Sequence, residues 1–228
     1  MSAPGNVFVI VPCFNEGSVV ATTVENLLSK GYQVLVVDDA SGDDTWTALQ
    51  QLPVYYVRHA INLGQGAALR TGFGLALQLG ADFIVTFDAD GQHDADDISP
   101  MLDALVQNRA EIVFGSRFLP GSQSNIPGTR KLVLKCARFF NYFASGILLS
   151  DANNGLRVMT GNAASKLLIT ENRSTHSAQI QSLVKQSNLR YAEYPVNVIY
   201  TAYSRRKGLK NINSVRILFD LLLFKVFR

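Results

Sequence analysis

The chain has 228 residues, of which 47% are hydrophobic and 17% are charged, and its formal net charge is +3. This length and composition predict an ordered domain with a substantial core, and they argue against a mostly disordered protein. The net charge is too small for a typical nucleic-acid-binding protein, so we expect no nucleic-acid partner. The two cysteines, Cys13 and Cys136, lack the number and spacing of a disulfide framework or a metal site.

Neither a targeting segment nor a membrane-spanning helix is expected. Residues 7–11 form a short apolar run that ends at Pro12, and this run is too short for a signal peptide. No apolar run reaches the roughly 18 residues of a spanning helix. The stretch 217–227 is apolar but is interrupted by Asp220 and Lys225, so it suits either a core helix or a helix at a membrane interface.

Short apolar runs alternate with stretches of helical spacing in the first half of the chain. The runs predict strands at residues 7–11, 34–38, 54–58, 83–87 and 112–115. The stretches between them predict helices near 18–29, 43–51, 66–79 and 95–108. This alternation predicts an α/β fold with a mainly parallel central sheet and helices on both faces. Further along the chain, the Gly-, Ser- and Pro-rich residues 121–128 predict a loop. The residues after it predict an amphipathic stretch at 130–149.

Polar loops follow the first four predicted strands, at residues 12–16, 38–45, 62–68 and 88–93. Ligands of open α/β sheets bind at the carboxyl ends of the strands. We therefore expect these loops to form one site.

Asp88 and Asp90 lie one residue apart at the end of the apolar run 83–87. Alternate residues of an extended segment share a face, so both carboxylates would point into the crevice beyond the sheet. Mg²⁺ and Mn²⁺ are commonly held by one or two carboxylates together with substrate phosphates. The pair therefore predicts a metal and a nucleotide or diphosphate ligand, although such pairs also form turns and helix caps.

Six short motifs follow one another between residues 7 and 160. They are Pro-x-Phe-Asn-Glu at 12–16, Val-Asp-Asp-x-Ser-x-Asp-x-Thr at 37–45, Asn-x-Gly-x-Gly-x-Ala at 62–68, Asp-x-Asp-Gly-Gln-His at 88–93, Gly-Ser-Arg at 115–117 and Asp-x-x-x-Gly-x-Arg at 151–157. In this order they resemble the motifs of family 2 glycosyltransferases with the GT-A fold. The resemblance is closest to the branch that contains dolichyl-phosphate mannose synthase and bacterial polyprenyl-phosphate glycosyltransferases.

The resemblance implies a single GT-A domain over 1–228. Its nucleotide-sugar-binding half would be 1–118, and its acceptor-side half, with a C-terminal amphipathic helix, would be 119–228. The residues implied to bind the nucleotide sugar are Pro12, Asn15, Glu16, Asp38, Asp39, Gly64, Gly66, Asp88, Ala89, Asp90 and Arg205.

The same resemblance implies that Asp88, Asp90 and Gln92 surround Mg²⁺ or Mn²⁺. It puts Arg117 and Arg130 near an acceptor phosphate, and it implies catalytic roles for Asp88, Asp90, Asp151 and Arg117. Simpler interpretations stay open for several residues. Asn15 and Glu16 could begin a helix, Asp43 and Thr45 could cap one, Gly64 and Gly66 could form a tight turn, and Asp151 could be a turn residue.

The activity implied is inverting, metal-dependent transfer of a sugar from a UDP- or GDP-sugar to polyprenyl phosphate, either dolichyl or undecaprenyl. A phosphate acceptor is already anionic and needs no strong base. This matters because relatives tend to have His-x-x-Glu where this chain has His176 to Gln179, and glutamine cannot act as a base. The alternatives are transfer to a saccharide hydroxyl in surface-glycan assembly, or a sugar-nucleotide-binding subunit of a membrane complex.

A peripheral location on the cytoplasmic face of the membrane is a further hypothesis. The basic stretch 130–138, the apolar residues 139–143 and the C-terminal helix together suit an anionic lipid surface. Core packing would explain each helix equally well. A small membrane-protein partner is also compatible with this arrangement.

Overall fold

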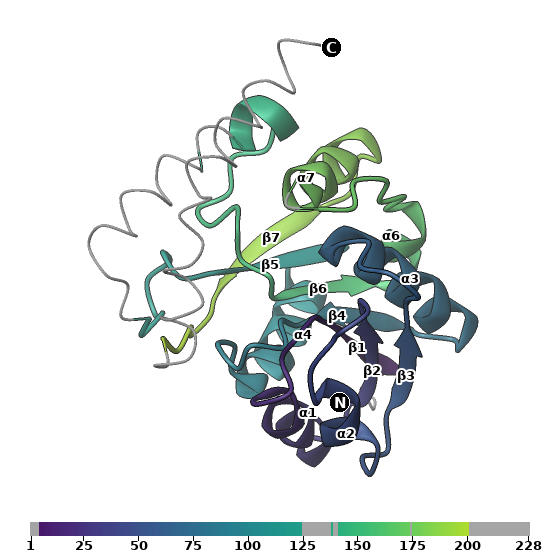
Figure 1. Cartoon of the computed structure of the whole chain (residues 1–228). Helices are drawn as coiled ribbons and strands as arrows, with labels where there is room; N and C mark the ends of the chain where they lie inside the picture. The colour runs from purple at the N-terminus through teal and green to yellow at the C-terminus, as the bar shows by residue number, and fades with distance from the viewer. Residues whose placement is uncertain (1–4, 125–137, 139–140, 174, 201–228) are drawn as a thin grey trace.

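The computed structural model describes residues 5–124, 138, 141–173 and 175–200. A seven-stranded sheet with the strand order β3-β2-β1-β4-β6-β5-β7 forms the centre of this part (Figure 1). Its strands are β1 (Val7–Cys13), β2 (Gln33–Asp38), β3 (Tyr55–Arg58), β4 (Phe83–Thr86), β5 (Ile112–Ser116), β6 (Arg157–Thr160) and β7 (Tyr191–Pro195). The predicted strands therefore exist, with ends that differ by one or two residues.

The sheet is mixed but mostly parallel. Strands β1 to β4 are parallel to one another, and β5 is parallel to β7. Only β6 is antiparallel, and it pairs with both β4 and β5. Strands from both predicted halves of the chain therefore belong to one sheet.

Helices cover both faces of the sheet. They are α1 (Val20–Ser29), α2 (Thr45–Leu49), α3 (Gln65–Gln78), the short 3₁₀ helix η1 (Ala95–Asp97), α4 (Ile98–Gln107), α6 (Gly161–Lys166) and α7 (His176–Gln186). Residues 141–145 are also helical. The predicted α/β architecture is confirmed, whereas β6, β7, α6 and α7 were not predicted.

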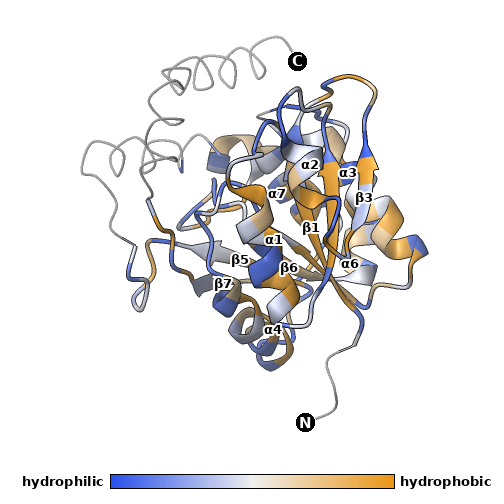
Figure 2. Ribbon diagram, turned by 60° about the horizontal axis from the view of Figure 1, so that its bottom comes forward, coloured by the Kyte–Doolittle hydropathy of each residue, from blue (hydrophilic) through white to orange (hydrophobic). Residues whose placement is uncertain are grey.

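The burial of β1 explains why helices cover both faces of the sheet. Val9 and Val11 pack into a core with α1 and α4, and the alternating Phe8 and Ile10 pack into a second core with α3, α6 and α7. Because side chains of a strand alternate between faces, a strand that is apolar throughout needs a layer on each side. Hydropathy colouring shows the labelled strand β1 as mostly hydrophobic (Figure 2).

No helix in the described ranges is long and apolar enough to cross a membrane. Most of the predicted amphipathic stretch 130–149 and all of the C-terminal apolar helix lie outside the described residues.

Candidate active site

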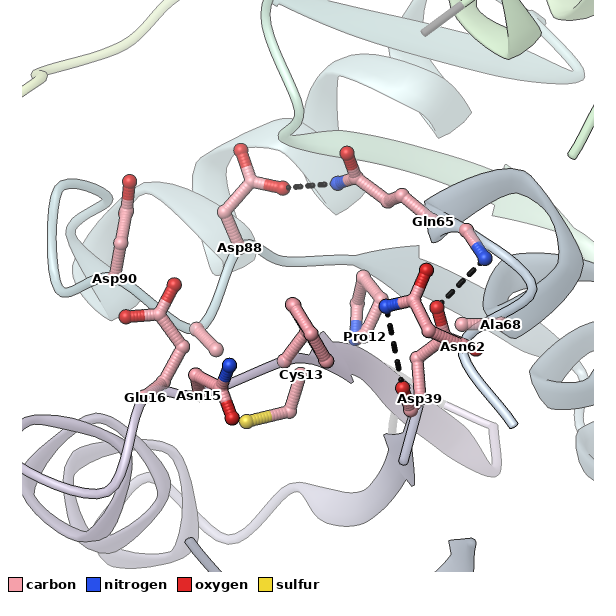
Figure 3. A pocket seen from close by; sticks show the side chains of 13 residues that line it. Pro12, Cys13, Asn15, Glu16, Asp39, Asn62, Gln65, Ala68, Asp88 and Asp90 are labelled. Atoms are coloured by element: carbon pink, nitrogen blue, oxygen red, sulfur yellow. Dashed lines mark hydrogen bonds between the residues drawn. The ribbon is translucent and has the colours of Figure 1, made fainter. Parts of the chain in front are cut away.

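A cavity of about 470 Å³ opens where β1, β2 and β4 end (Figure 3). We call it the donor cavity. Its lining residues are Pro12, Cys13, Phe14, Asn15, Glu16, Asp39, Asn62, Gly64, Gln65, Ala68, Asp88, Ala89 and Asp90. Most of the residues predicted to bind a nucleotide sugar are brought together here, from four separate loops, as the strand-end argument predicts.

The two adjacent aspartates after β2 have different surroundings. Asp39 lines the cavity and accepts hydrogen bonds from the backbone N–H groups of Leu63 and Gly64. Asp38 is fully buried, where it accepts from Ser41 N–H and from the Tyr56 hydroxyl. Asp38 does not line the cavity, so its contacts are those of a residue that supports the loop.

The two glycines of the third loop make room for another part of the chain. A Cβ atom at Gly66 would lie 1.9 Å from the carbonyl oxygen of Glu171, and one at Gly64 would lie 2.2 Å from that of Asn172. Gly64 also has a φ of +105°, which favours glycine. Gly64 lines the cavity, whereas Gly66 donates its N–H to Asn172 and does not line it.

Asp88 lies at the centre of the site. Its Oδ1 accepts from Gln65 Nε2 at 2.9 Å, and its Oδ2 lies 3.1 Å from Nε2 of His93. Burial opposes ionisation of Asp88, but the hydrogen bond and attraction of His93, with Arg157 and His176, lower its pKa to about 2. Asp88 is therefore a carboxylate at neutral pH and available to a cation.

Asp90 is the second carboxylate of the cavity. It accepts from the backbone N–H of Gln92 at 3.1 Å and from the Gln92 side-chain amide. Burial, followed by the negative charge of Asp88, raises the pKa of Asp90. The repulsion between the two carboxylates is what a bound cation would relieve.

Asp88 and Asp90 fit Mg²⁺ or Mn²⁺ held jointly with a ligand. In the described ranges, no group of three or more His, Cys, Asp or Glu side chains could hold a metal by itself. These metals need only one or two carboxylates when substrate phosphates complete the shell. Gln92 turns its amide nitrogen toward Asp90, so its predicted role as an oxygen ligand would require that amide to turn over.

A second, smaller cavity shares Asp88 with the donor cavity. We call it the acceptor-side cavity. Its volume is about 90 Å³, and its lining residues are Asp88, Gln92, His93, Arg117, Asn153, Asn154, Gly155 and Val198. A Cβ atom at Gly155 would lie 2.0 Å from Oδ2 of Asp88, so only glycine lets this carboxylate face both cavities.

Arg117 and Asp151, both predicted to act on the acceptor side, form a buried ion pair. Nε of Arg117 lies 2.6 Å from Oδ2 of Asp151, and Nη2 lies 2.8 Å from Oδ1. Burial alone would lower the pKa of Arg117, but the pair with Asp151 raises it. Both oxygens of Asp151 are used by Arg117, and Nη1 of Arg117 reaches the Tyr200 hydroxyl at 3.1 Å.

Arg157 and His176 were in predicted motifs but had no assigned role. Arg157 is 2% exposed, and its Nη2 donates to Ser177. Burial lowers its pKa to about 10 against the attraction of Asp88 and Asp151. Burial, and then Arg157, lower the pKa of His176 to about 4. The signal for Arg157 was a charged residue at the start of a short apolar segment, which favours a partner for buried carboxylates.

His93 is the other missed residue. It is 8% exposed, it directly contacts Asp88, and its ring packs edge-on against Phe87. The sequence signal was its place at the end of the Asp-x-Asp-Gly-Gln-His motif.

Several open alternatives concern the starts of helices. Glu16 lines the cavity, and its carbonyl oxygen also accepts from Val19 and Val20 at the start of α1. Asn15 accepts from Gly42 N–H, and its φ is +55°. Asp43 accepts from Gly17 N–H and Thr45 N–H just before α2, but the N-cap residue of α2 is Asp44, so Asp43 orders the loop and is not itself the cap. Asn15 and Glu16 therefore belong to the cavity and also order the loop.

Gln179 lies in neither cavity. Its Oε1 accepts from the N–H groups of Thr170 and Glu171, and its Nε2 donates to the Thr170 hydroxyl. The side chain supports the segment that packs on Gly64 and Gly66. Arg130 and Arg205, predicted to bind the acceptor phosphate and the donor, lie outside the described residues.

Comparisons with known proteins identify the family of the chain. The model of the family described as glycosyl transferase family 2 matches residues 8–168. A UDP-N-acetylglucosamine–dolichyl-phosphate N-acetylglucosaminyltransferase of Methanococcus voltae is 30% identical over 241 residues, which cover 96% of each chain. A polyprenol monophosphomannose synthase of Mycolicibacterium smegmatis is 32% identical over 168 residues, which cover 70% of this chain and 63% of that protein.

Among solved structures, glucosyl-3-phosphoglycerate synthase of Mycobacterium tuberculosis superposes with a TM-score of 0.71 at 16% identity, over 97% of this chain and 80% of that one. At this identity the likeness concerns the fold, and it confirms the predicted GT-A architecture. The family match and the two relatives confirm the resemblance seen in the motifs. This chain belongs to glycosyl transferase family 2.

Proposed function

We propose that this glycosyltransferase moves a sugar from a nucleotide sugar to polyprenyl phosphate, with inversion at the anomeric carbon. The observation that carries the proposal is the position of Asp88, which is shared by the donor cavity and the Arg117-lined cavity. A diphosphate on one side of Asp88 and an anionic acceptor on the other would bring the two reacting groups together. The printed name of the Methanococcus voltae relative, a dolichyl-phosphate glycosyltransferase, supports the same acceptor class.

The donor's diphosphate would lie at the Asp88 and Asp90 end of the donor cavity. These two residues would hold Mg²⁺ or Mn²⁺, which supplies stabilisation of the negative charge that develops on the leaving nucleoside diphosphate. Gln65 and His93 orient Asp88 from two sides, through the hydrogen bonds to its two oxygens. The carboxylate is thereby held in one orientation before the donor arrives.

The acceptor would be positioned by Arg117. A phosphate monoester carries a charge of about −1.5 to −2 near pH 7, so its oxygen can attack the anomeric carbon without a strong base. Attack from the side opposite the leaving group inverts that carbon. Asp151 fits a positioning role, because both of its oxygens hold the Arg117 guanidinium. Gln179, which lies in neither cavity, has no part in this scheme.

Contact with the membrane surface is part of the proposal. Tyr142 and Phe143 are 42% and 66% exposed, and Asn141 beside them bonds to Asn153 of the acceptor-side cavity. Exposed aromatic side chains next to the acceptor end suit a lipid-borne substrate. We expect the protein to bind anionic liposomes at low salt, and less so when both aromatic residues are replaced by serine. An absence of binding at low salt would contradict a peripheral membrane location.

The test of activity uses purified protein, MnCl₂, a panel of UDP- and GDP-sugars and a short polyprenyl phosphate, with lipid-linked sugar detected by mass spectrometry. We expect product from one donor, and none with Asp90→Ala, although that variant keeps its fold by circular dichroism. Product formed equally by Asp90→Ala would contradict the metal-site assignment. Donor binding without product would contradict the acceptor and favour a saccharide hydroxyl or a binding subunit.

A further inference from the structure

Asp39 lies across the donor cavity from Asp88 and Asp90 (Figure 3). Under the proposed function, on which this inference rests, the diphosphate and its metal occupy the Asp88 end. The nucleoside then extends toward Asp39, so the carboxylate of Asp39 faces the base.

The hydrogen bonds of Asp39 leave little capacity for a ligand. An ionised carboxylate has about four acceptor sites, two on each oxygen. Oδ1 accepts from Leu63 N–H at 2.9 Å and contacts Nδ1 of His59 at 2.7 Å. Because a carboxylate cannot donate, His59 must be the donor in this contact. Oδ2 accepts from Gly64 N–H at 2.6 Å.

Oδ1 is therefore saturated, and Oδ2 has one acceptor site left. Uracil presents a single N–H, flanked by two carbonyl groups. Guanine presents two neighbouring N–H donors on one edge and is matched by a carboxylate with a vacant site on each oxygen. We infer that the donor is a uridine diphosphate sugar, and that His59 and the two backbone N–H groups set this preference by occupying Asp39.

Asn15 complements this arrangement. Its Oδ1 accepts from Gly42 N–H at 2.8 Å, which leaves its amide nitrogen as the donor on the cavity side for a base carbonyl. A uracil ring would then find one acceptor for its N–H and one donor for a carbonyl. A guanine ring would keep one N–H unpaired in a partly buried site, which is unfavourable.

The test is titration calorimetry of UDP and GDP with the full chain in MnCl₂. Both nucleotides carry the same diphosphate and metal, so the ratio of their Kd values reports the base. We expect UDP to bind at least about tenfold more tightly, the usual consequence of one unpaired donor. Equal affinity, or tighter binding of GDP, would overturn the inference. Binding of neither nucleotide would instead overturn the donor site and the proposed function.

Three variants test the role of His59. His59→Phe removes the donor and frees a site on Oδ1, so the Kd ratio should fall several-fold toward one. His59→Asn keeps an N–H at the position of Nδ1 and should keep the ratio. Thr71→Val removes the other partner of the His59 ring, Oγ1 at 3.0 Å from Nε2, without changing Asp39, and should also keep the ratio. If folded His59→Phe kept the same ratio of Kd values for UDP and GDP, the occupied acceptor sites of Asp39 would not set the preference for the base.

Discussion

The donor cavity and the acceptor-side cavity share Asp88 but are built in different ways. On the donor side, backbone N–H groups share in holding the carboxylates: Asp39 accepts from two loop N–H groups as well as from His59, and Asp90 accepts from one as well as from the Gln92 side chain. On the acceptor side, Arg117 depends on the side chain of Asp151, 34 residues away. Backbone donors come with the fold, whereas a side-chain pair fails when either partner changes. Substitutions should therefore act locally on the donor side and in pairs on the acceptor side.

Replacing Asp88 should have the largest effect, because this residue belongs to both cavities. We expect Asp88→Ala to lose metal-dependent donor binding and to lower turnover by at least about 10²–10³-fold, since charge stabilisation at the leaving group is lost. Calorimetry with the nucleotide and a transfer assay measure the two effects. Asp103→Ala removes a carboxylate from the exposed face of α4 and serves as the control. If Asp88→Ala kept its turnover, neither cavity would depend on Asp88, and the view that this residue joins them would be wrong.

The same contrast explains how much could be predicted from the sequence. The donor loops follow continuous apolar strands, so their positions could be inferred, and Asp39, Asp88 and Asp90 do meet in one cavity. What those residues bond to could not be inferred. Asp38 looks equivalent to Asp39 in the sequence, yet Asp39 lines the cavity and Asp38 is turned to Ser41 and Tyr56. Gly64 and Gly66 suggested a ligand approach, but their neighbour is the backbone of Glu171 and Asn172.

The acceptor side was harder to predict because β6 does not look like a strand. It has only four residues and begins with the buried Arg157, so it lacks a continuous apolar run. In the sheet, β6 lies between β4 and β5 and pairs with both. The local sequence pattern does not predict this position. Arg117 and Asp151 were predicted separately as acceptor-side candidates, and nothing in the sequence pointed to the ion pair between them.

Arg117→Lys should have the second-largest effect on activity, and this effect should be confined to the acceptor side. Lysine keeps the positive charge but loses the planar fork that engages both oxygens of Asp151. We expect kcat/KM for the acceptor to fall by about 10–100-fold, the range for losing a supporting contact at a functional group. Donor affinity should stay unchanged, because Arg117 does not line the donor cavity. A matching loss of donor affinity would argue that the two sides are not independent.

Gly66→Ala tests whether the backbone supports the donor side. The new Cβ would collide with the carbonyl of Glu171, so we expect a loss of about 1–3 kcal/mol in the free energy of unfolding. The matched control is Gly74→Ala in the same helix, where a Cβ meets nothing within 4 Å. That variant should gain about 0.5–1 kcal/mol. Urea denaturation followed by circular dichroism measures both. Equal stability of the two variants would contradict the packing of 171–172 on α3.

Gln179→Glu should have the smallest effect, although relatives in the branch that this chain resembles tend to have a glutamate at this position. A carboxylate can still accept from Thr170 and Glu171 N–H, and only the donation to the Thr170 hydroxyl is lost. We expect the free energy of unfolding to change by less than about 1 kcal/mol, and turnover to change less than about twofold. Gln179→Ala removes the oxygen that accepts from both N–H groups and should cost about 1–3 kcal/mol. A large gain of turnover in Gln179→Glu would mean that a base at this position reaches the reacting groups, and that the acceptor is a hydroxyl rather than a phosphate.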